Sequence, residues 1–266
     1  MTFQLGKANG HPFAYRGKAA LAHILFSIVF LAIPLIAITW HAYPGSLFWG
    51  DGGAQLIKIA LGVDLVLGPS LTFLAFSPTK KIKPLALDIT IILILQLSAF
   101  GYGFNSMWVQ RPAAVVYSER AFRSISHVQM MEEPNPQVAK QIGSIGAPQL
   151  FYRFPSTKVA ELQRFLTDAQ SDGRAYTVRS SHWTTMAQMT QQDVERMGKD
   201  DMLLTHIQNP EERKEISDWI AKQPNPKRLK LYALGMRYKN NVVAFDLDKR
   251  EIVKYFDIDP GNLMTL

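Results

Sequence analysis

Cysteine is absent from the 266 residues of the chain. This absence excludes disulfide bonds, thiol nucleophiles and thiolate ligands for a metal. The patterns G-x-S-x-G and G-x-G-x-x-G and the phosphate-binding Walker pattern are also missing, and the six histidines lack the spacing of metal ligands. We therefore expect no cofactor, no metal site and no enzymatic activity.

Acidic residues are scarce in the first part of the chain. Up to residue 103 there are three Asp or Glu and seven Lys or Arg, whereas the remainder holds 19 and 22. The pI near 9.5 fits nucleic-acid-binding proteins, but the second part is nearly balanced and has no basic stripe. We therefore exclude nucleic acid as a partner. The second part is long enough for a water-soluble domain with its own core.

Three apolar runs, at 19–40, 56–76 and 85–103, are each about as long as the roughly 20 residues that cross a bilayer. A cleavable signal peptide is the alternative for the first run. The apolar region of a signal peptide is normally about 7–15 residues long, whereas this run has 22. The sequence therefore predicts three transmembrane helices within a domain at 19–103.

The basic residues predict the orientation of these helices. The tail 1–18 has three Lys or Arg and no acid, the loop 41–54 has neither Lys nor Arg, and the loop 77–84 contains Lys80, Lys81 and Lys83. Because basic short loops stay in the cytoplasm, we expect the tail and the second loop inside. The first loop and the domain at 104–266 are then outside, which in a Gram-negative bacterium is the periplasm beyond the inner membrane.

The domain at 104–266 is predicted to be α+β. Its expected helices are 156–173, 190–198 and 211–222, and its expected strands are 113–117, 125–131 and 176–180. Residues 134–148 are rich in proline and glycine and are predicted to form an irregular segment. The end of the chain alternates polar and apolar residues and predicts an antiparallel β-meander of 231–239, 242–247 and 252–258, with a tight turn at Asn240-Asn241.

Polar residues interrupt the second and third apolar runs. Lys58 lies near the outer end of its helix, where its long side chain can extend to the interface. Asp88 lies about 6 Å into its helix and is expected to face the lysines of its own loop. The alternative for both residues is a functional role, because charges within membrane helices are costly and rare.

Asp64 and Gln96 are predicted at the same depth. Each lies 12 residues from the inner end of its helix, about 18 Å into the membrane. The pattern predicts a hydrogen bond between them, worth roughly 0.6–2 kcal/mol; the alternative is that Asp64 faces a helix of a partner. Gly62, Gly68 and Pro69 share the helix of Asp64, and small residues allow close helix packing. An aspartyl peptidase is disfavoured because Asp64 and Asp88 differ by about 12 Å in depth.

Several of these segments resemble the type IV pilin accessory proteins of the TfpX/TfpZ type. The resemblance is carried by GVDLVLGPSLTFLAF at 62–76, by LALDITIILILQLSAFGYG at 85–103 and by Arg111-Pro112. The matching positions are Asp64, Gly68, Pro69, Asp88, Gln96, Tyr102, Gly103, Arg111 and Pro112. After Pro112 the sequence departs from the family pattern, with Glu119-Arg120-Ala121-Phe122 and with Asp259-Pro260-Gly261 at the end of the meander.

The resemblance implies an inner-membrane accessory protein, a chaperone or assembly factor, that stabilises or presents a type IV pilin subunit during pilus biogenesis. Its expected partners are the pilin subunit, membrane lipid and the pilus assembly machinery. The candidate site for a partner helix consists of polar and small residues in the membrane, namely Asp64, Gln96, Asp88, Lys58, Gly62, Gly68 and Pro69. The alternative function is a membrane-anchored periplasmic sensor or ligand-binding module.

Overall fold

The chain is described by a computed structural model. It covers residues 12–118, 120–131, 138, 140, 142, 148–154, 158–160, 163, 167, 178–199 and 203–261. The chain divides into two compact units, Met1–Trp40 with Ala54–Trp108, and His41–Gly53 with Val109–Leu266. The segment 41–53, predicted only as a loop between two spans, thus packs within the unit that contains the sheet.

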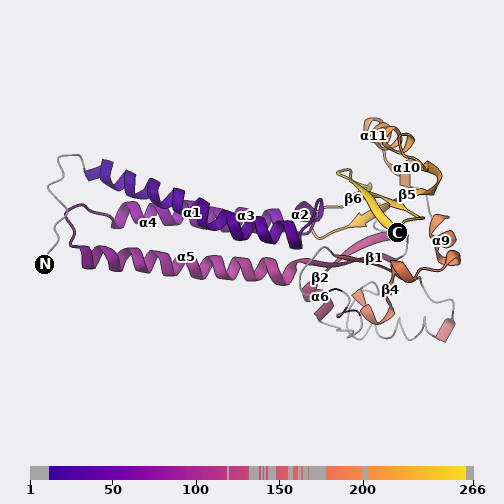
Figure 1. The fold of residues 1–266 in the computed structure, drawn as a ribbon, viewed down its shortest axis with the longest axis horizontal. Helices are drawn as coiled ribbons and strands as arrows, with labels where there is room; N and C mark the ends of the chain where they lie inside the picture. Colours follow the sequence, from indigo (N-terminus) through magenta and orange to yellow (C-terminus); the bar gives the residue numbers. More distant parts are fainter. Residues whose placement is uncertain are drawn as a thin grey trace. The chain divides into compact units, whose positions relative to one another are not determined.

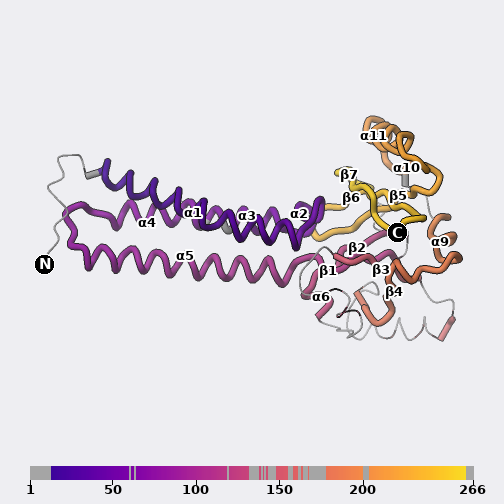
Figure 2. Tube along the Cα trace, viewed as in Figure 1, coloured from indigo at the N-terminus to yellow at the C-terminus, as the bar shows by residue number. Residues whose placement is uncertain are grey.

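The first unit is built of helices, which Figures 1 and 2 show running alongside one another. Three helical stretches are long and apolar enough to cross a membrane: Phe13–Ala42, Gly53–Ala75 and Ile82–Gln110. The elements in chain order are α1 (Pro12–Ala42), α3 (Gly53–Gly62), η1 (Val63–Leu67), α4 (Gly68–Ala75) and α5 (Ile82–Gln110). The first and third stretches extend beyond the predicted spans at both ends, and the second begins earlier but ends at Ala75. Arg16 and Lys18 of the predicted tail already belong to α1.

The outward faces of these helices are apolar. Ile33 on α1 and Leu74 on α4 are 71% and 69% exposed, and many other large apolar side chains are similarly uncovered. In water such a surface would be strongly unfavourable. Aromatic contacts hold α1 to both of its neighbours, through Phe13 with Phe73 and Phe30 with Phe100.

The second predicted span contains one π-helical turn, η1, immediately before Gly68 and Pro69. Proline has no amide hydrogen and its ring clashes with the carbonyl four residues earlier in a regular α-helix. The wider turn of a π-helix accommodates this disruption inside a continuous helical stretch. Asp64 lies within this turn, so the local distortion helps to set the direction of its side chain.

The second unit contains a mixed sheet of seven strands in the order β4-β3-β1-β2-β5-β6-β7. The strands are β1 (Pro112–Ser118), β2 (Ala121–Ser126), β3 (Gln149–Tyr152), β4 (Thr184–Thr185), β5 (Leu229–Gly235), β6 (Asn241–Asp246) and β7 (Glu251–Phe256). The pairs β1–β3 and β2–β5 are parallel, and the other neighbouring pairs are antiparallel. Figure 1 shows helices on both faces of this sheet.

The sheet has an apolar core on each face, because successive side chains of a strand point to opposite faces. On β5, Tyr232 and Leu234 belong to one cluster, with Val194 and Met197 of α9 (Gln191–Gly198). Leu231 and Ala233 belong to the other face, where Ile216 of α11 (Pro210–Ala221) packs. Burial on both faces explains why β1 is a continuous apolar run.

Most of the predicted elements of this unit are present. The strand at 113–117, the antiparallel meander and the helices at 190–198 and 211–222 are confirmed. Thr190 and Asp193 form a reciprocal capping box at the start of α9, and the side chain of Asn209 accepts a hydrogen bond from the amide of Glu211 in α11. These caps satisfy amide groups that a helix leaves unpaired at its start.

Two predictions are wrong. The segment 125–131 is not a strand: β2 ends at Ser126, and His127–Met131 forms the short helix α6. Arg120, with φ of 69°, makes the tight connection from β1 to β2 that the sequence reading missed. The turn between β5 and β6 is also longer than Asn240-Asn241, because Leu234 pairs directly with Asn241. The predicted irregular segment 134–148, helix 156–173 and strand 176–180 lie largely outside the described residues.

Candidate functional site

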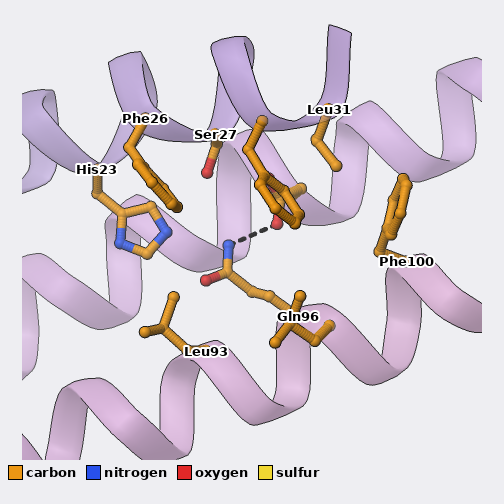
Figure 3. Close-up of a pocket in the computed structure, with 10 residues that line it drawn as sticks. His23, Phe26, Ser27, Leu31, Leu93, Gln96 and Phe100 are labelled. Atoms are coloured by element: carbon orange, nitrogen blue, oxygen red, sulfur yellow. Dashed lines mark hydrogen bonds between the residues drawn. The ribbon is translucent and has the colours of Figure 1, made fainter. Parts of the chain in front are cut away.

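The polar centre of the first unit is the hydrogen bond between Gln96 on α5 and Asp64 in η1. The Gln96 side-chain amide donates from Nε2 to Oδ1 of Asp64 at 2.5 Å (Figure 3). Asp64 is only 8% exposed. The contact is the one that the matched depths of the two residues predict, and it joins the second helical stretch to the third.

A second polar contact joins the first helix to the same stretch. The hydroxyl of Thr72 on α4 lies 2.7 Å from Nδ1 of His23 on α1. Thr72 is buried and His23 is partly buried. The three helical stretches are therefore held together by polar contacts as well as by apolar packing.

Gly68 allows these two contacts to lie close together. A Cβ atom added at Gly68 would lie 2.8 Å from Nε2 of His23 and still nearer to Nε2 of Gln96. Any larger residue would therefore displace the ends of both side chains, unless the backbone moves. Pro69, the next residue, is also buried, so this part of the helix faces the interior of the bundle.

A cavity of about 210 Å³ opens beside this polar centre. Figure 3 shows the Gln96 amide and the His23 ring with Phe26 and Phe100 around them. The lining is otherwise mostly apolar and comes from all three helical stretches: His23, Phe26, Ser27, Phe30, Leu31, Asp64, Leu93, Gln96, Leu97 and Phe100.

Two polar atoms of the cavity residues have no partner. Within the described part of the chain, Nε2 of His23 and Oε1 of Gln96 are buried and make no hydrogen bond. A buried polar group without a partner costs about 1–3 kcal/mol. The cavity is thus lined mainly by apolar side chains, and two of its lining residues carry a buried polar atom without a hydrogen bond.

The other predicted site residues lie apart from this cavity. Asp88 forms an ion pair with Lys80, and both side chains are about one-third exposed. Lys58 is exposed. Gly62 is exposed and has open space where a side chain would be. The structure therefore brings together Asp64, Gln96, Gly68 and Pro69 but leaves Asp88, Lys58 and Gly62 outside the cluster.

Sequence reasoning missed His23, Ser27 and Thr72. His23 and Ser27 are spaced i, i+4 within the first apolar run and so share one helix face. That spacing was the available signal. Depth in the membrane was compared only for the charged residues and Gln96, and not for neutral histidine and hydroxyl side chains.

The second unit has its own polar centre, at Asp51 of the segment 41–53. The Ser124 hydroxyl donates to Oδ2 of Asp51 at 2.6 Å, and the Arg237 amide donates to Oδ1 at 3.2 Å. The amide of Tyr238 also donates to the carbonyl of Gly50 at 2.8 Å. These bonds fix 41–53 against β2 and the β5–β6 turn.

Burial governs ionisation around this centre. It raises the pKa of Asp51, although the hydrogen bonds from Ser124 and Arg237 oppose the shift. Burial also raises the pKa of Tyr43, and the negative charge of Asp51 adds to that effect. For Arg111, a residue of the Arg-Pro motif, burial lowers the pKa.

Three curated proteins of Dichelobacter nodosus are similar to the chain. One, the fimbrial assembly protein of serogroups C1 and C2, is 31% identical over 131 residues, which are 48% of this chain and 98% of that protein. The fimbrial assembly proteins of serogroups I and E1 are 31% and 33% identical over the same length, which is half of each. No family model and no solved structure matches the chain. Its near-complete coverage of the first relative shows that the chain belongs to the family of fimbrial assembly proteins.

Proposed function

We propose that the chain is an inner-membrane accessory protein of type IV pilus assembly, of the TfpX/TfpZ type, that holds a pilin subunit before it enters the fibre. Membership of the fimbrial assembly family supports a role in pilus assembly. Three helical stretches long and apolar enough to cross a bilayer support a place in the membrane. The role is binding and presentation of a subunit, not catalysis.

The cavity beside Gln96 carries the proposal. An unassembled pilin is a membrane helix with a head domain outside, so its binding site must include a surface for a helix in lipid. His23 Nε2 and Gln96 Oε1 are covered in the unbound chain. A rotation of these two side chains on binding lets a polar side chain of the partner helix supply their missing hydrogen bonds. Hydrogen bonds between membrane helices contribute roughly 0.6–2 kcal/mol, enough to set the register of an apolar contact.

The membrane topology follows from the charges and agrees with the division into units. The cytoplasmic side has Lys80, Lys81 and Lys83, and basic short loops stay inside. That orientation requires the segment 41–53 and the chain after residue 109 to lie on one side of the membrane. Their packing in a single compact unit supports this requirement. The sheet domain is then periplasmic, on the side of the pilin head.

Deletion of the gene tests the proposed function. We expect a lower level of the cognate pilin or fewer pili, restored by the wild-type gene, and no effect on an unrelated pilin. Complementation with Gln96→Leu should fail, whereas Gly62→Ala, which alters an exposed position with open space around it, should succeed. Normal pilin levels and normal fibres in the deletion strain would contradict the proposal.

A further inference from the structure

The second unit has a polar pocket of about 340 Å³ that none of the arguments above uses. It lies where the parallel pairing of β2 with β5 ends: Arg123 and Gly235, the last residues paired between them, both line it. Ligands of sheets with parallel strands commonly bind beyond the carboxyl ends of the strands. The volume is within the usual range of small-ligand sites, roughly 300–1,000 Å³.

The carboxylate of Asp51 and the amide oxygen of Gln129 in this pocket already accept hydrogen bonds. Both carboxylate oxygens of Asp51 accept hydrogen bonds, from Ser124 and from the Arg237 amide. Oε1 of Gln129 accepts from the amide and the hydroxyl of Ser126, each at 3.0 Å. The one carboxylate of the lining is therefore already occupied by donors of the chain itself.

Two side-chain donors of the pocket, on Arg123 and Gln129, have no hydrogen-bond acceptor among the described residues. Arg123 on β2 is half-buried, and its guanidinium makes no hydrogen bond or ion pair with any residue whose position is described. Because Oε1 of Gln129 is turned toward Ser126, its Nε2 is a second donor that finds no acceptor among those residues. The lining contains two positively charged residues, Arg123 and Arg237, and one negatively charged residue, Asp51, so its formal charge is +1.

We propose that this pocket binds a carboxylate of an acidic peptide segment, either a side chain or a chain end. The guanidinium of Arg123 holds the carboxylate by two parallel hydrogen bonds, the geometry in which arginine binds this group best. Nε2 of Gln129 donates a further hydrogen bond. A single negative charge matches the net charge of the lining, whereas the two charges of a phosphate exceed it.

The pocket belongs to the sheet unit and does not depend on the cavity between the helices. It is a separate point of contact for a protein partner, whether or not that partner is a pilin. If no carboxylate binds in the pocket, the proposal that the helices hold a pilin is unaffected. If the helices do not hold a pilin, the pocket can still bind a carboxylate.

The test uses the full chain in zwitterionic phosphatidylcholine nanodiscs and saturation-transfer NMR. The probe is N-acetyl-glutamate methylamide, and the matched neutral control is N-acetyl-glutamine methylamide. We expect the glutamate probe to bind at least tenfold more tightly than the control, which corresponds to about 1.4 kcal/mol. Equal binding of the two probes, or displacement of the glutamate probe by inorganic phosphate at concentrations below that of the probe, would overturn the assignment.

The residue assignment is tested with Arg123→Gln, which should weaken binding of the glutamate probe about tenfold. Arg228→Gln is the control, because Arg228 is in the same unit but pairs with Asp248 outside the pocket. Where Arg123→Gln does not fold, Arg123→Lys serves instead, since lysine keeps the charge but loses the planar fork. Undiminished binding by a folded Arg123 variant would refute the role of this side chain.

Discussion

Replacement of Gly68 by alanine should loosen the helix bundle at its polar centre. The added Cβ would lie 2.8 Å from Nε2 of His23 and nearer still to Nε2 of Gln96, closer than such atoms can approach. Either the backbone of α4 moves outward, or the His23 ring shifts and Gln96 leaves Asp64. We expect the free energy of unfolding to fall by about 1–3 kcal/mol, the usual cost of an extra methyl group in a packed interior.

Gly62→Ala is the matched control on the same helical stretch. An added Cβ at Gly62 meets nothing within 4 Å. Alanine is also the better helix former, by about 0.8–1 kcal/mol in soluble helices. This variant should be neutral or slightly stabilising. The assay is reversible unfolding of the detergent-solubilised protein with SDS, followed by circular dichroism.

A second substitution identifies which contact causes the loss. In the background of Gln96→Ala, the side chain nearest to the new Cβ is gone, so Gly68→Ala should cost clearly less than it does alone. The difference is the coupling energy between the two positions. Equal stabilities of Gly68→Ala and Gly62→Ala, or no coupling with Gln96, would refute the close packing on which the cavity depends.

Three further predictions concern single residues. Asp64→Asn keeps an oxygen to accept from Gln96 and should preserve pilin levels, whereas Asp64→Leu should not; equal loss in an immunoblot would point to a required negative charge. The pKa of Asp51 is raised above its ordinary 3.8 by burial, so the stability that it contributes is greatest below that value and falls as the pH rises through the raised pKa. The difference in melting temperature between wild type and Asp51→Asn should therefore decrease from acid to neutral pH, and a constant difference would contradict the burial argument. Thr190→Ala removes the cap of α9 and should lower the free energy of unfolding by about 1 kcal/mol. The measurement is the midpoint of thermal unfolding, which should fall. An unchanged midpoint would show that the cap does not stabilise this unit.

The sequence was sufficient for features that depend on local pattern. Helix rise alone placed Asp64 and Gln96 at one depth, and the structure contains their hydrogen bond. Alternating residues and turn signals gave the antiparallel meander of β5, β6 and β7. In each case the relevant spacing is fixed by the repeat of a helix or a strand.

Features that depend on distant pairings were not visible in the sequence. Asp51 and Arg237 are 186 residues apart, so no local pattern indicates that the segment 41–53 packs with the sheet unit. The parallel pairing of β2 with β5 joins segments separated by about a hundred residues and creates the polar pocket. β2 itself, AFRSIS, carries Arg123 and Ser124 at half-buried positions and Ser126 at a buried one, so it lacks the alternation that predicts a strand.

The cavity between the helices depends on a combination of small effects. The π-helical turn, Gly68 and the ring of His23 together decide how closely the helices approach. No one of these residues predicts a cavity by itself. Gly62 and Gly68 look equivalent in the sequence, but the first is exposed and only the second lies against polar side chains.

In-membrane photo-crosslinking tests the central claim most directly. Phe26 and Phe30 line the cavity and are 59% and 44% exposed, so either accepts a benzoyl-phenylalanine of similar shape. Val29, on the same helix and 65% exposed, does not line the cavity and is the control. We expect a crosslink to the transmembrane helix of the pilin from positions 26 and 30 but not from 29. No crosslink to pilin from either cavity position, or equal crosslinking from position 29, would contradict it.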